Sequence, residues 1–352
     1  MRTLRVRVDH DLCVGNGTCL TIAPAVFAHN AHRQSEVIDA AGASESVILH
    51  AAANCPVGAI SVALAESGEA LPIATRRTAM APSPARARIT TTELVAMKRE
   101  QRKIVMLTAY DSLFASLIDQ AGVDVILVGD SVGPVLAGES STLPVTVKQM
   151  IYHGRSVQRG TAHALVVVDL PFLSYQVSPE EATRHGGKVL KRTGASAVKL
   201  EGGRDFAPAV HALVTAGIPV MGHLGLTPQS LNVLGGIHVH GRDASAAQRL
   251  IDDAQALEEA GAFGIVLELI GTDAARRITE SITIPTIGIG SGPHCDGQVL
   301  VLHDMLGLNE QFHAKFVKRF AELGASVRQA VATYADEVRS VAFPDEAHSH
   351  KG

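Results

Sequence analysis

The sequence predicts an α/β protein in which a (β/α)₈ TIM barrel follows a small α+β domain. Three observations lead to this prediction. The chain has 352 residues, more than one domain usually contains. Hydrophobic residues make up 46% of it while aromatic residues make up 4%, so small aliphatic side chains must build the core. From residue 90 onward, eight short apolar runs alternate with Ala-rich stretches.

Charge and hydropathy exclude two classes of partner. The net charge is -4 with both signs dispersed, so no basic face for nucleic acid is expected. The N-terminus has no apolar signal segment, and no apolar run approaches the ~20 residues that span a bilayer. We therefore expect a cytoplasmic protein without a membrane segment.

Residues 1–65 form the predicted small domain. LRVRVDH (4–10) and AISVAL (59–64) have the pattern of strands, and SESVILHAAANC (44–55) that of a helix. Residues 66–89 contain three prolines and no sustained apolar periodicity, which is typical of a linker. The barrel domain is then residues 90–352.

The eight apolar runs are the predicted barrel strands. Continuous apolar runs indicate strands that are buried on both faces, as in a parallel sheet. An open, doubly wound sheet produces similar runs, but eight of them over about 250 residues favour a closed barrel. The runs are 104–111, 123–131, 164–172, 197–203, 218–225, 264–270, 284–290 and 298–304.

Most of these runs finish in a polar or glycine residue. In a (β/α)₈ barrel the carboxyl ends of the strands converge on the active site. Strands often end in polar residues simply because they enter loops, but the joint pattern favours a site. The candidate site residues are Tyr110, Asp130, Ser131, Asp169, Lys199, Glu201, His223 and Glu268.

Three of these residues suit a metal ion. Asp130, Asp169 and Glu201 are carboxylates from three strand ends, which favours Mg²⁺ or another hard divalent cation. Such a metal could chelate a 2-oxo acid and stabilise its enolate. Glu268, at the end of an apolar run, is the candidate base. Lys199 could hold the substrate carboxylate; the alternative is a salt bridge to Glu201 or Asp169.

Three of the four cysteines lie in the small domain. Cys13, Cys19 and Cys55 match a bacterial ferredoxin pattern in which Asn16 takes the place of the middle cysteine. Three thiolates fit a [3Fe-4S] cluster, or a [4Fe-4S] cluster with a fourth ligand that is not cysteine. Incidental cysteines and a zinc site are the alternatives. The surrounding DLC, GTC and APAVF resemble the small ferredoxins that serve bacterial cytochromes P450.

Longer strings resemble an enzyme family. TAYD, LVGDSVG, STLPVT, VDLPF, VKLEGG, GHLGLTPQS, GIGSG, DGQVLVLHD and FPDEAHSH follow one another as in ketopantoate hydroxymethyltransferases, over about residues 90–350. The resemblance implies transfer of a hydroxymethyl group from 5,10-methylenetetrahydrofolate to 3-methyl-2-oxobutanoate, through a metal-stabilised enolate. The product would be 2-dehydropantoate, in pantothenate biosynthesis. It also implies a homo-oligomer.

The same resemblance implies roles for the strand-end residues. Asp130 and Asp169 would be metal ligands, with Glu201 close to the metal, and Glu268 would remove the substrate proton. The residues that would contact substrate or line its pocket are Ser131, Lys199, His223 and Tyr110.

Two other functions are alternatives. One is a metal-dependent C–C lyase acting on a 2-oxo acid, and the other an electron-transfer protein with a vestigial barrel. Because hydroxymethyl transfer moves no net electrons, the purpose and redox partner of the ferredoxin-like domain stay open.

Overall fold

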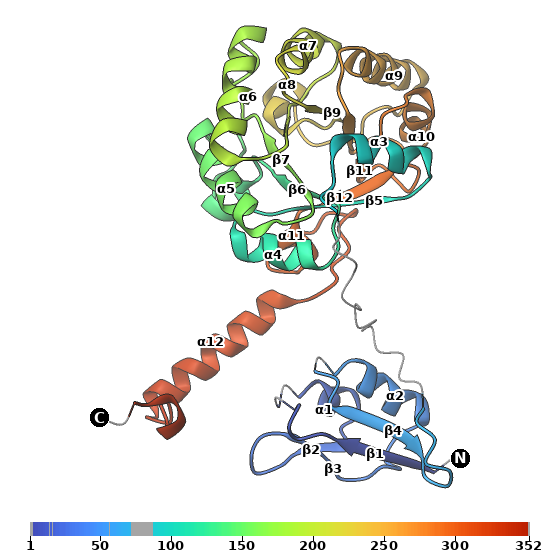
Figure 1. Ribbon diagram of the computed structural model, residues 1–352, viewed down its shortest axis with the longest axis vertical. Coiled ribbons are helices and arrows are strands. Elements are labelled where there is room, and N and C mark those ends of the chain that lie inside the picture. Colours follow the sequence, from blue (N-terminus) through green and yellow to red (C-terminus); the bar gives the residue numbers. More distant parts are fainter. Residues whose placement is uncertain (1–2, 14, 16, 56, 72–86, 351–352) are drawn as a thin grey trace. The chain divides into compact units, whose positions relative to one another are not determined.

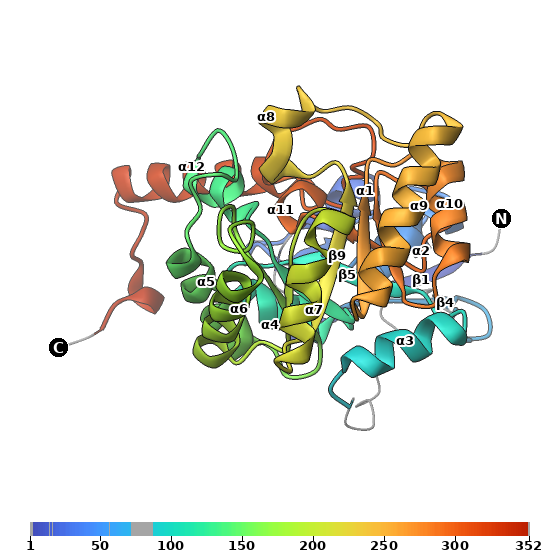
Figure 2. The ribbon, with the colours of Figure 1, turned by 90° about the horizontal axis from the view of Figure 1, so that it is seen from above.

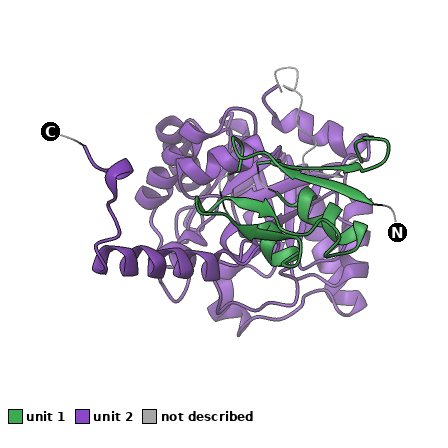
Figure 3. Cartoon of the chain, turned by 90° about the horizontal axis from the view of Figure 1, so that it is seen from below, with its two compact units in different colours: residues 1–86 green, residues 87–352 purple. Residues whose placement is uncertain are grey.

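The computed structural model describes residues 3–71, apart from 14, 16 and 56, and residues 87–350. It divides into two compact units, residues 1–86 and 87–352 (Figures 1 and 3), each with a hydrophobic core of its own. The predicted linker, residues 66–89, falls mostly on residues 72–86, outside the described residues. Just before them, the Leu71 N–H donates to Val62 O. Among the described residues, no helix is long and apolar enough to cross a membrane.

The first unit consists of two antiparallel strand pairs and two helices. The pairs are β1 (Leu4–Val8) with β4 (Ile60–Leu64) and β2 (Phe27–His29) with β3 (Ser35–Val37); the helices are α1 (Thr18–Ile22) and α2 (Glu45–Ala53). The strands predicted over 4–10 and 59–64, and the helix predicted over 44–55, are confirmed. The sequence does not predict β2 and β3, because strands of three residues are too short to show alternation.

The second unit is the predicted barrel. Its eight parallel strands close in chain order, with β12 beside β5, and each overlaps one of the eight predicted runs. The strands are β5 (Ile104–Thr108), β6 (Val125–Val128), β7 (Leu165–Asp169), β8 (Ala197–Lys199), β9 (Val220–Gly225), β10 (Gly264–Glu268), β11 (Thr286–Ile289) and β12 (Gly297–Leu300). The closed (β/α)₈ barrel is therefore confirmed.

Helices surround the strands (Figure 2). Several begin directly after a side chain that accepts a hydrogen bond from the first turn, as Asp111, Thr146, Ser178 and Asp243 do. These helices are α3 (Thr91–Arg99), α4 (Ser112–Gln120), α5 (Val147–Gly160), α6 (Pro179–Thr193), α7 (Ala207–Thr215), α8 (Leu231–Leu234), α9 (Ala244–Glu259), α10 (Thr272–Ser281) and α11 (Leu302–Met305). The last helix, α12 (Leu323–Arg339), has Gly324 as its one buried residue and does not cover the strands.

Alternate side chains along each strand enter two different layers. Val167 packs in one cluster with residues of the barrel interior, whereas its neighbours Val166 and Val168 pack in the cluster that contains the helices. Because side chains two residues apart share a face, the inward row of β7 continues from Val167 to Asp169. In the same way, the inward row of β10 continues from Val266 to Glu268.

Candidate active site

A cavity of about 160 Å³ lies at the carboxyl ends of the barrel strands. Seven of the eight candidate residues line it: Asp130, Ser131, Asp169, Lys199, Glu201, His223 and Glu268. The eighth, Tyr110, is buried behind the wall, where its hydroxyl lies 2.8 Å from Ser131 Oγ. The structure therefore brings together the side chains that the sequence singles out, while their roles stay predictions.

Lys199 forms an ion pair with Asp169. Its Nζ lies 3.0 Å from Asp169 Oδ1, and both side chains are at most 5% exposed. Burial lowers the pKa of Lys199, but the carboxylates of Asp169, Glu201 and Asp130 outweigh this effect and hold the pKa above its ordinary value. The salt bridge that the sequence leaves as an alternative for Lys199 is thus present, and the ammonium group still lines the cavity.

His223 stands between two carboxylates on the inward row of β9. Its Nδ1 lies 3.3 Å from Lys199 Nζ and 3.6 Å from Glu201 Oε1, and its Nε2 lies 3.3 Å from Glu268 Oε2. Burial and the charge of Lys199 lower the pKa of His223, but Glu201 and Glu268 raise it to about 9. Glu268, at the end of β10, is more exposed than His223: 18% of its side chain is exposed, against 4% for His223.

Asp130 is a buried acid among other acids. Burial raises its pKa well above the ordinary range, and the charges of Asp169 and Glu201 raise it further. The Asp130 N–H donates to Asp169 Oδ2 over 3.0 Å, so the two strand ends are tied together. Ionised carboxylates at this density are costly unless they are paired, and the Lys199 ammonium group is a cation beside them.

Gln229 bonds to two of the candidate site residues, although the sequence does not single it out. It lies in the turn after β9, is 5% exposed, and its Nε2 donates to Asp130 Oδ2 at 2.8 Å and to Leu170 O at 3.1 Å. Its Oε1 accepts from Tyr175 Oη at 2.9 Å and from Gln176 Nε2 at 3.0 Å. Its N–H also donates to a Glu201 Oε2 3.0 Å away. Gln229 therefore holds two of the candidate metal ligands.

Replacing Gln229 by Leu is expected to destabilise the barrel. The change removes the amide that donates to a buried Asp130 oxygen and to Leu170 O, at a cost of about 1–3 kcal/mol in unfolding free energy. The Tyr175 hydroxyl keeps its hydrogen bonds to the Glu201 backbone. Chemical denaturation measures the loss. Gln176→Leu is the matched control, since it removes two hydrogen bonds, to Gln229 Oε1 and from the Tyr175 N–H, at a half-buried side chain. Equal stabilities for the two variants would contradict the assignment.

The strand-end carboxylates Asp130, Asp169 and Glu201 are the side chains that would hold a metal ion in the barrel. Among the described residues, no group of three His, Cys, Asp or Glu side chains is arranged so that it could hold one as it stands. Two features nevertheless fit a hard cation. The buried Asp169 Oδ1 faces Lys199 without a hydrogen bond of good geometry. The charges of Asp169 and Glu201 raise the pKa of Asp130, and that of Glu201 raises the pKa of Asp169. A bound cation would lower the raised pKa values of Asp130 and Asp169, because a nearby positive charge favours the ionised acids.

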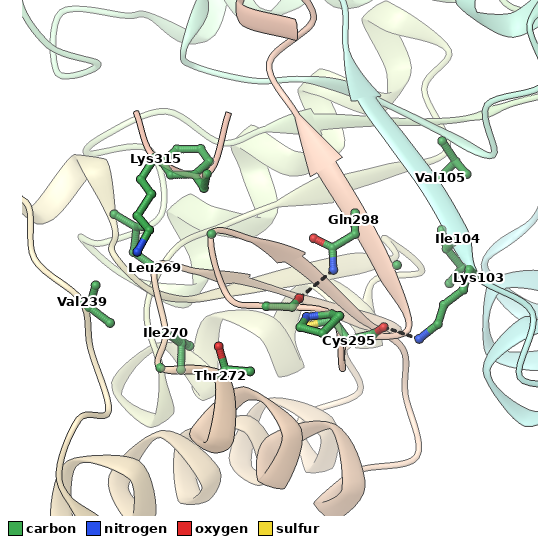
Figure 4. A pocket seen from close by; sticks show the side chains of 16 residues that line it. Lys103, Ile104, Val105, Val239, Leu269, Ile270, Thr272, Cys295, Gln298 and Lys315 are labelled. Carbon is green, nitrogen blue, oxygen red and sulfur yellow. Dashed lines mark hydrogen bonds between the residues drawn. The ribbon is translucent and has the colours of Figure 1, made fainter. Parts of the chain in front are cut away.

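A larger cavity, of about 920 Å³, lies against the outer side of the barrel (Figure 4). Residues 290–296 join β11 to β12 without a helix, so the outer faces of β12 and β5 have little cover and Val105 is 49% exposed. Lys103 Nζ donates to Cys295 O at 2.6 Å along its edge. None of the candidate site residues is among those that line it.

In the first unit, Cys13, Cys19 and Cys55 line one small cavity together with Ser35. None of them forms a disulfide. The Ser35 N–H donates to Cys13 Sγ over 3.4 Å and the Ala59 N–H to Cys55 Sγ over 3.3 Å. Three thiols that face one cavity, two of which receive an N–H donor, fit an iron–sulfur cluster, whose sulfurs accept such bonds.

Known proteins resemble both units. Residues 88–346 match the family model described as ketopantoate hydroxymethyltransferase, and residues 8–62 match that of the 4Fe-4S single cluster domain of ferredoxin I. The 3-methyl-2-oxobutanoate hydroxymethyltransferase of Syntrophus aciditrophicus is 54% identical over 262 residues, 74% of this chain and 96% of the relative. That of Moorella thermoacetica is 54% identical over 266 residues, 76% of this chain and 99% of the relative.

A solved structure shares the fold. Phosphonopyruvate hydrolase is 14% identical and covers 75% of this chain and 92% of its own, with a TM-score of 0.50. This likeness concerns the barrel alone. The family model, in contrast, matches the barrel from before its first strand to beyond α12, and the predicted resemblance is confirmed. The chain belongs to the ketopantoate hydroxymethyltransferase family, with a ferredoxin-like unit fused ahead of the enzyme.

Proposed function

We propose that the barrel transfers a hydroxymethyl group from 5,10-methylenetetrahydrofolate to 3-methyl-2-oxobutanoate. With one water, the products are 2-dehydropantoate and tetrahydrofolate. The observation that carries this proposal is a single cavity in which a base, an ammonium group and several carboxylates meet, in a chain 54% identical to enzymes named for this reaction.

Glu268 would remove the proton from C3 of the substrate. Its carboxylate is the partly exposed member of the buried row, so a substrate can reach it. His223 Nε2, 3.3 Å away, would orient this carboxylate and take up charge as the proton moves. The C3 carbanion would then form a bond to the methylene carbon. Both bonds from this carbon to folate nitrogens break, and the oxygen of one water bonds to it to give the hydroxymethyl group. The C3 proton and one proton of that water end on the two folate nitrogens.

Lys199 and Ser131 would hold the substrate carboxylate. Lys199 is buried, charged and directed into the cavity, and such an ammonium group favours a carboxylate partner. Ser131 Oγ lies against the Tyr110 hydroxyl, which restricts the directions in which it can donate.

Asp130 and Asp169 would hold a divalent cation, Mg²⁺ or a similar ion, with Glu201 close by. When bound, the cation would withdraw electron density from the substrate's keto group and so acidify C3. Gln229 keeps Asp130 and Glu201 in place for this task.

A product assay tests the proposal. 2-Dehydropantoate should form only when 3-methyl-2-oxobutanoate, methylenetetrahydrofolate and a divalent cation are all present. Cleavage of a 2-oxo or dicarboxylic acid without folate would instead identify a C–C lyase, and no turnover under any of these conditions would favour the vestigial barrel.

The first unit would carry an iron–sulfur cluster on Cys13, Cys19 and Cys55. With three thiolates the cluster would be [3Fe-4S], or [4Fe-4S] with a fourth ligand that is not cysteine. Its role would be electron transfer with a separate redox partner.

The barrel should not depend on this cluster. No step of the transfer gains or loses an electron, so a shortened chain that starts at Ala87 should keep its turnover number within a few-fold. It starts there because Ile89 is buried and its N–H donates to His163 O. The full chain with Cys13→Ser and Cys55→Ser, which should be colourless, is the matched comparison. Activity lost in both, with the barrel folded and metal-loaded, would show that the first unit regulates the enzyme.

A further inference from the structure

Ser35 touches two of the three thiols in the first unit. It is the first residue of β3 and is only 2% exposed. Its hydroxyl lies 2.9 Å from Cys19 Sγ, and its backbone N–H donates to Cys13 Sγ over 3.4 Å. Cys13 precedes α1 and Cys19 lies within it, so Ser35 contacts thiols from two segments of the chain.

The position of Ser35 is fixed from both sides. Gln34 Nε2 donates to His10 O at 2.7 Å and to Cys13 O at 2.9 Å, which holds the start of β3 against the segment from His10 to Cys13. Ser35 O lies 3.1 Å from His10 Nε2. These contacts hold the start of β3 where the Ser35 hydroxyl can reach Cys19 Sγ.

The three thiols differ in what donates to them. Cys13 and Cys55 each receive a backbone N–H, from Ser35 and Ala59. Cys19 Sγ instead lies 2.9 Å from a side-chain hydroxyl, that of Ser35. A backbone donor survives any substitution except Pro, whereas a hydroxyl can be removed by mutation. A buried hydroxyl also costs free energy unless it is bonded, and an anionic sulfur is a stronger acceptor than a neutral thiol.

We propose that Ser35 sets the reduction potential of the cluster by donating a hydrogen bond to the Cys19 sulfur; this inference rests on the proposed cluster. One-electron reduction adds negative charge to the iron and its sulfur ligands, and no bond is made or broken at Ser35. A donor to a ligand sulfur stabilises the reduced form more than the oxidised form, which raises the potential. Ser35 is thus a positioning and tuning residue, not a ligand.

The test is a redox titration of the full chain, reconstituted anaerobically with iron and sulfide and poised with dithionite and mediators. Ser35→Ala keeps the N–H to Cys13 and loses the hydroxyl. It should bind the same iron and sulfide, but at the wild-type midpoint its ratio of reduced to oxidised cluster should fall about tenfold, about 59 mV for one electron. Ser35→Thr, which retains a hydroxyl, should stay close to wild type. Ser46→Ala, an exposed serine of α2, is the control.

Each outcome separates the two claims. An unchanged potential in Ser35→Ala at full iron content would overturn the role of Ser35 and leave the cluster intact. Equal shifts in Ser35→Ala and Ser35→Thr would also overturn it, because the hydroxyl would not be the cause. If Ser35→Ala bound no cluster, a wild-type potential in Ser35→Thr would still support the hydroxyl. A wild-type chain that binds no iron or sulfide would overturn the proposed cluster itself.

Discussion

Asp130→Asn and Asp169→Asn are each expected to abolish metal-dependent turnover while leaving the barrel folded. Both residues end adjacent strands and share a hydrogen bond from the Asp130 N–H to Asp169 Oδ2. Asn keeps the shape and, at Asp130, an oxygen that can accept from Gln229, but it removes the charge that a divalent cation needs. Isothermal titration calorimetry with Mg²⁺ measures the loss of metal affinity, and the product assay measures the loss of turnover.

Asp130→Asn should also stabilise the metal-free protein. The folded-state pKa of Asp130 is raised by burial first and by Asp169 and Glu201 second. An acid with a raised pKa lowers stability as pH rises from its ordinary value of about 4 towards the raised one. At pH 7 the variant should therefore melt at a higher temperature than the metal-free wild type, and this difference should vanish near pH 4.

The matched control is Asp304→Asn. Asp304 is a buried carboxylate of the same cavity, but it bonds to Asn309 instead of to the other strand-end acids. The Asp304→Asn variant should keep the wild-type affinity for Mg²⁺. Full activity in either Asp130→Asn or Asp169→Asn would remove that residue from the ligand set.

Glu268→Gln should block exchange of the C3 proton of 3-methyl-2-oxobutanoate with solvent. Proton removal precedes carbon transfer, so the wild type should exchange this proton without folate. Losing a general base typically costs about 10²–10⁴-fold in rate. NMR in D₂O follows the exchange. Affinity for Mg²⁺ should be nearly unchanged, because Glu268 contacts His223, away from the Asp130–Asp169 pair.

Glu259→Gln, an exposed change at the end of α9, serves as the control for this experiment. If Glu268→Gln exchanges the proton at the wild-type rate, the base is another residue. His223→Gln would then be the next variant, since His223 Nε2 lies 3.3 Å from Glu268 Oε2.

Much of the barrel can be read from local pattern. Strands covered on both faces carry unbroken apolar runs, which locates all eight of them. The two-residue period then places Asp169, Lys199, His223 and Glu268 on inward rows, so their meeting in one cavity follows from the sequence once the barrel closes. Ser291 in GIGSG has a structural role: its hydroxyl donates to Leu267 O and accepts from the Ile270 N–H, joining the loops beside Glu268.

Other features depend on tertiary structure alone. Lys199 pairs with Asp169, although spacing allows Glu201 equally well. Gln229 reaches Asp130 from 99 positions away, and the Ser35 hydroxyl meets Cys19 through a hairpin that has no sequence signal. The physical reason is the range of each constraint. The face of the sheet on which a side chain lies, and whether it is buried, follow a period of two within one strand. A hydrogen-bond partner depends instead on where separate segments lie after the whole unit has packed.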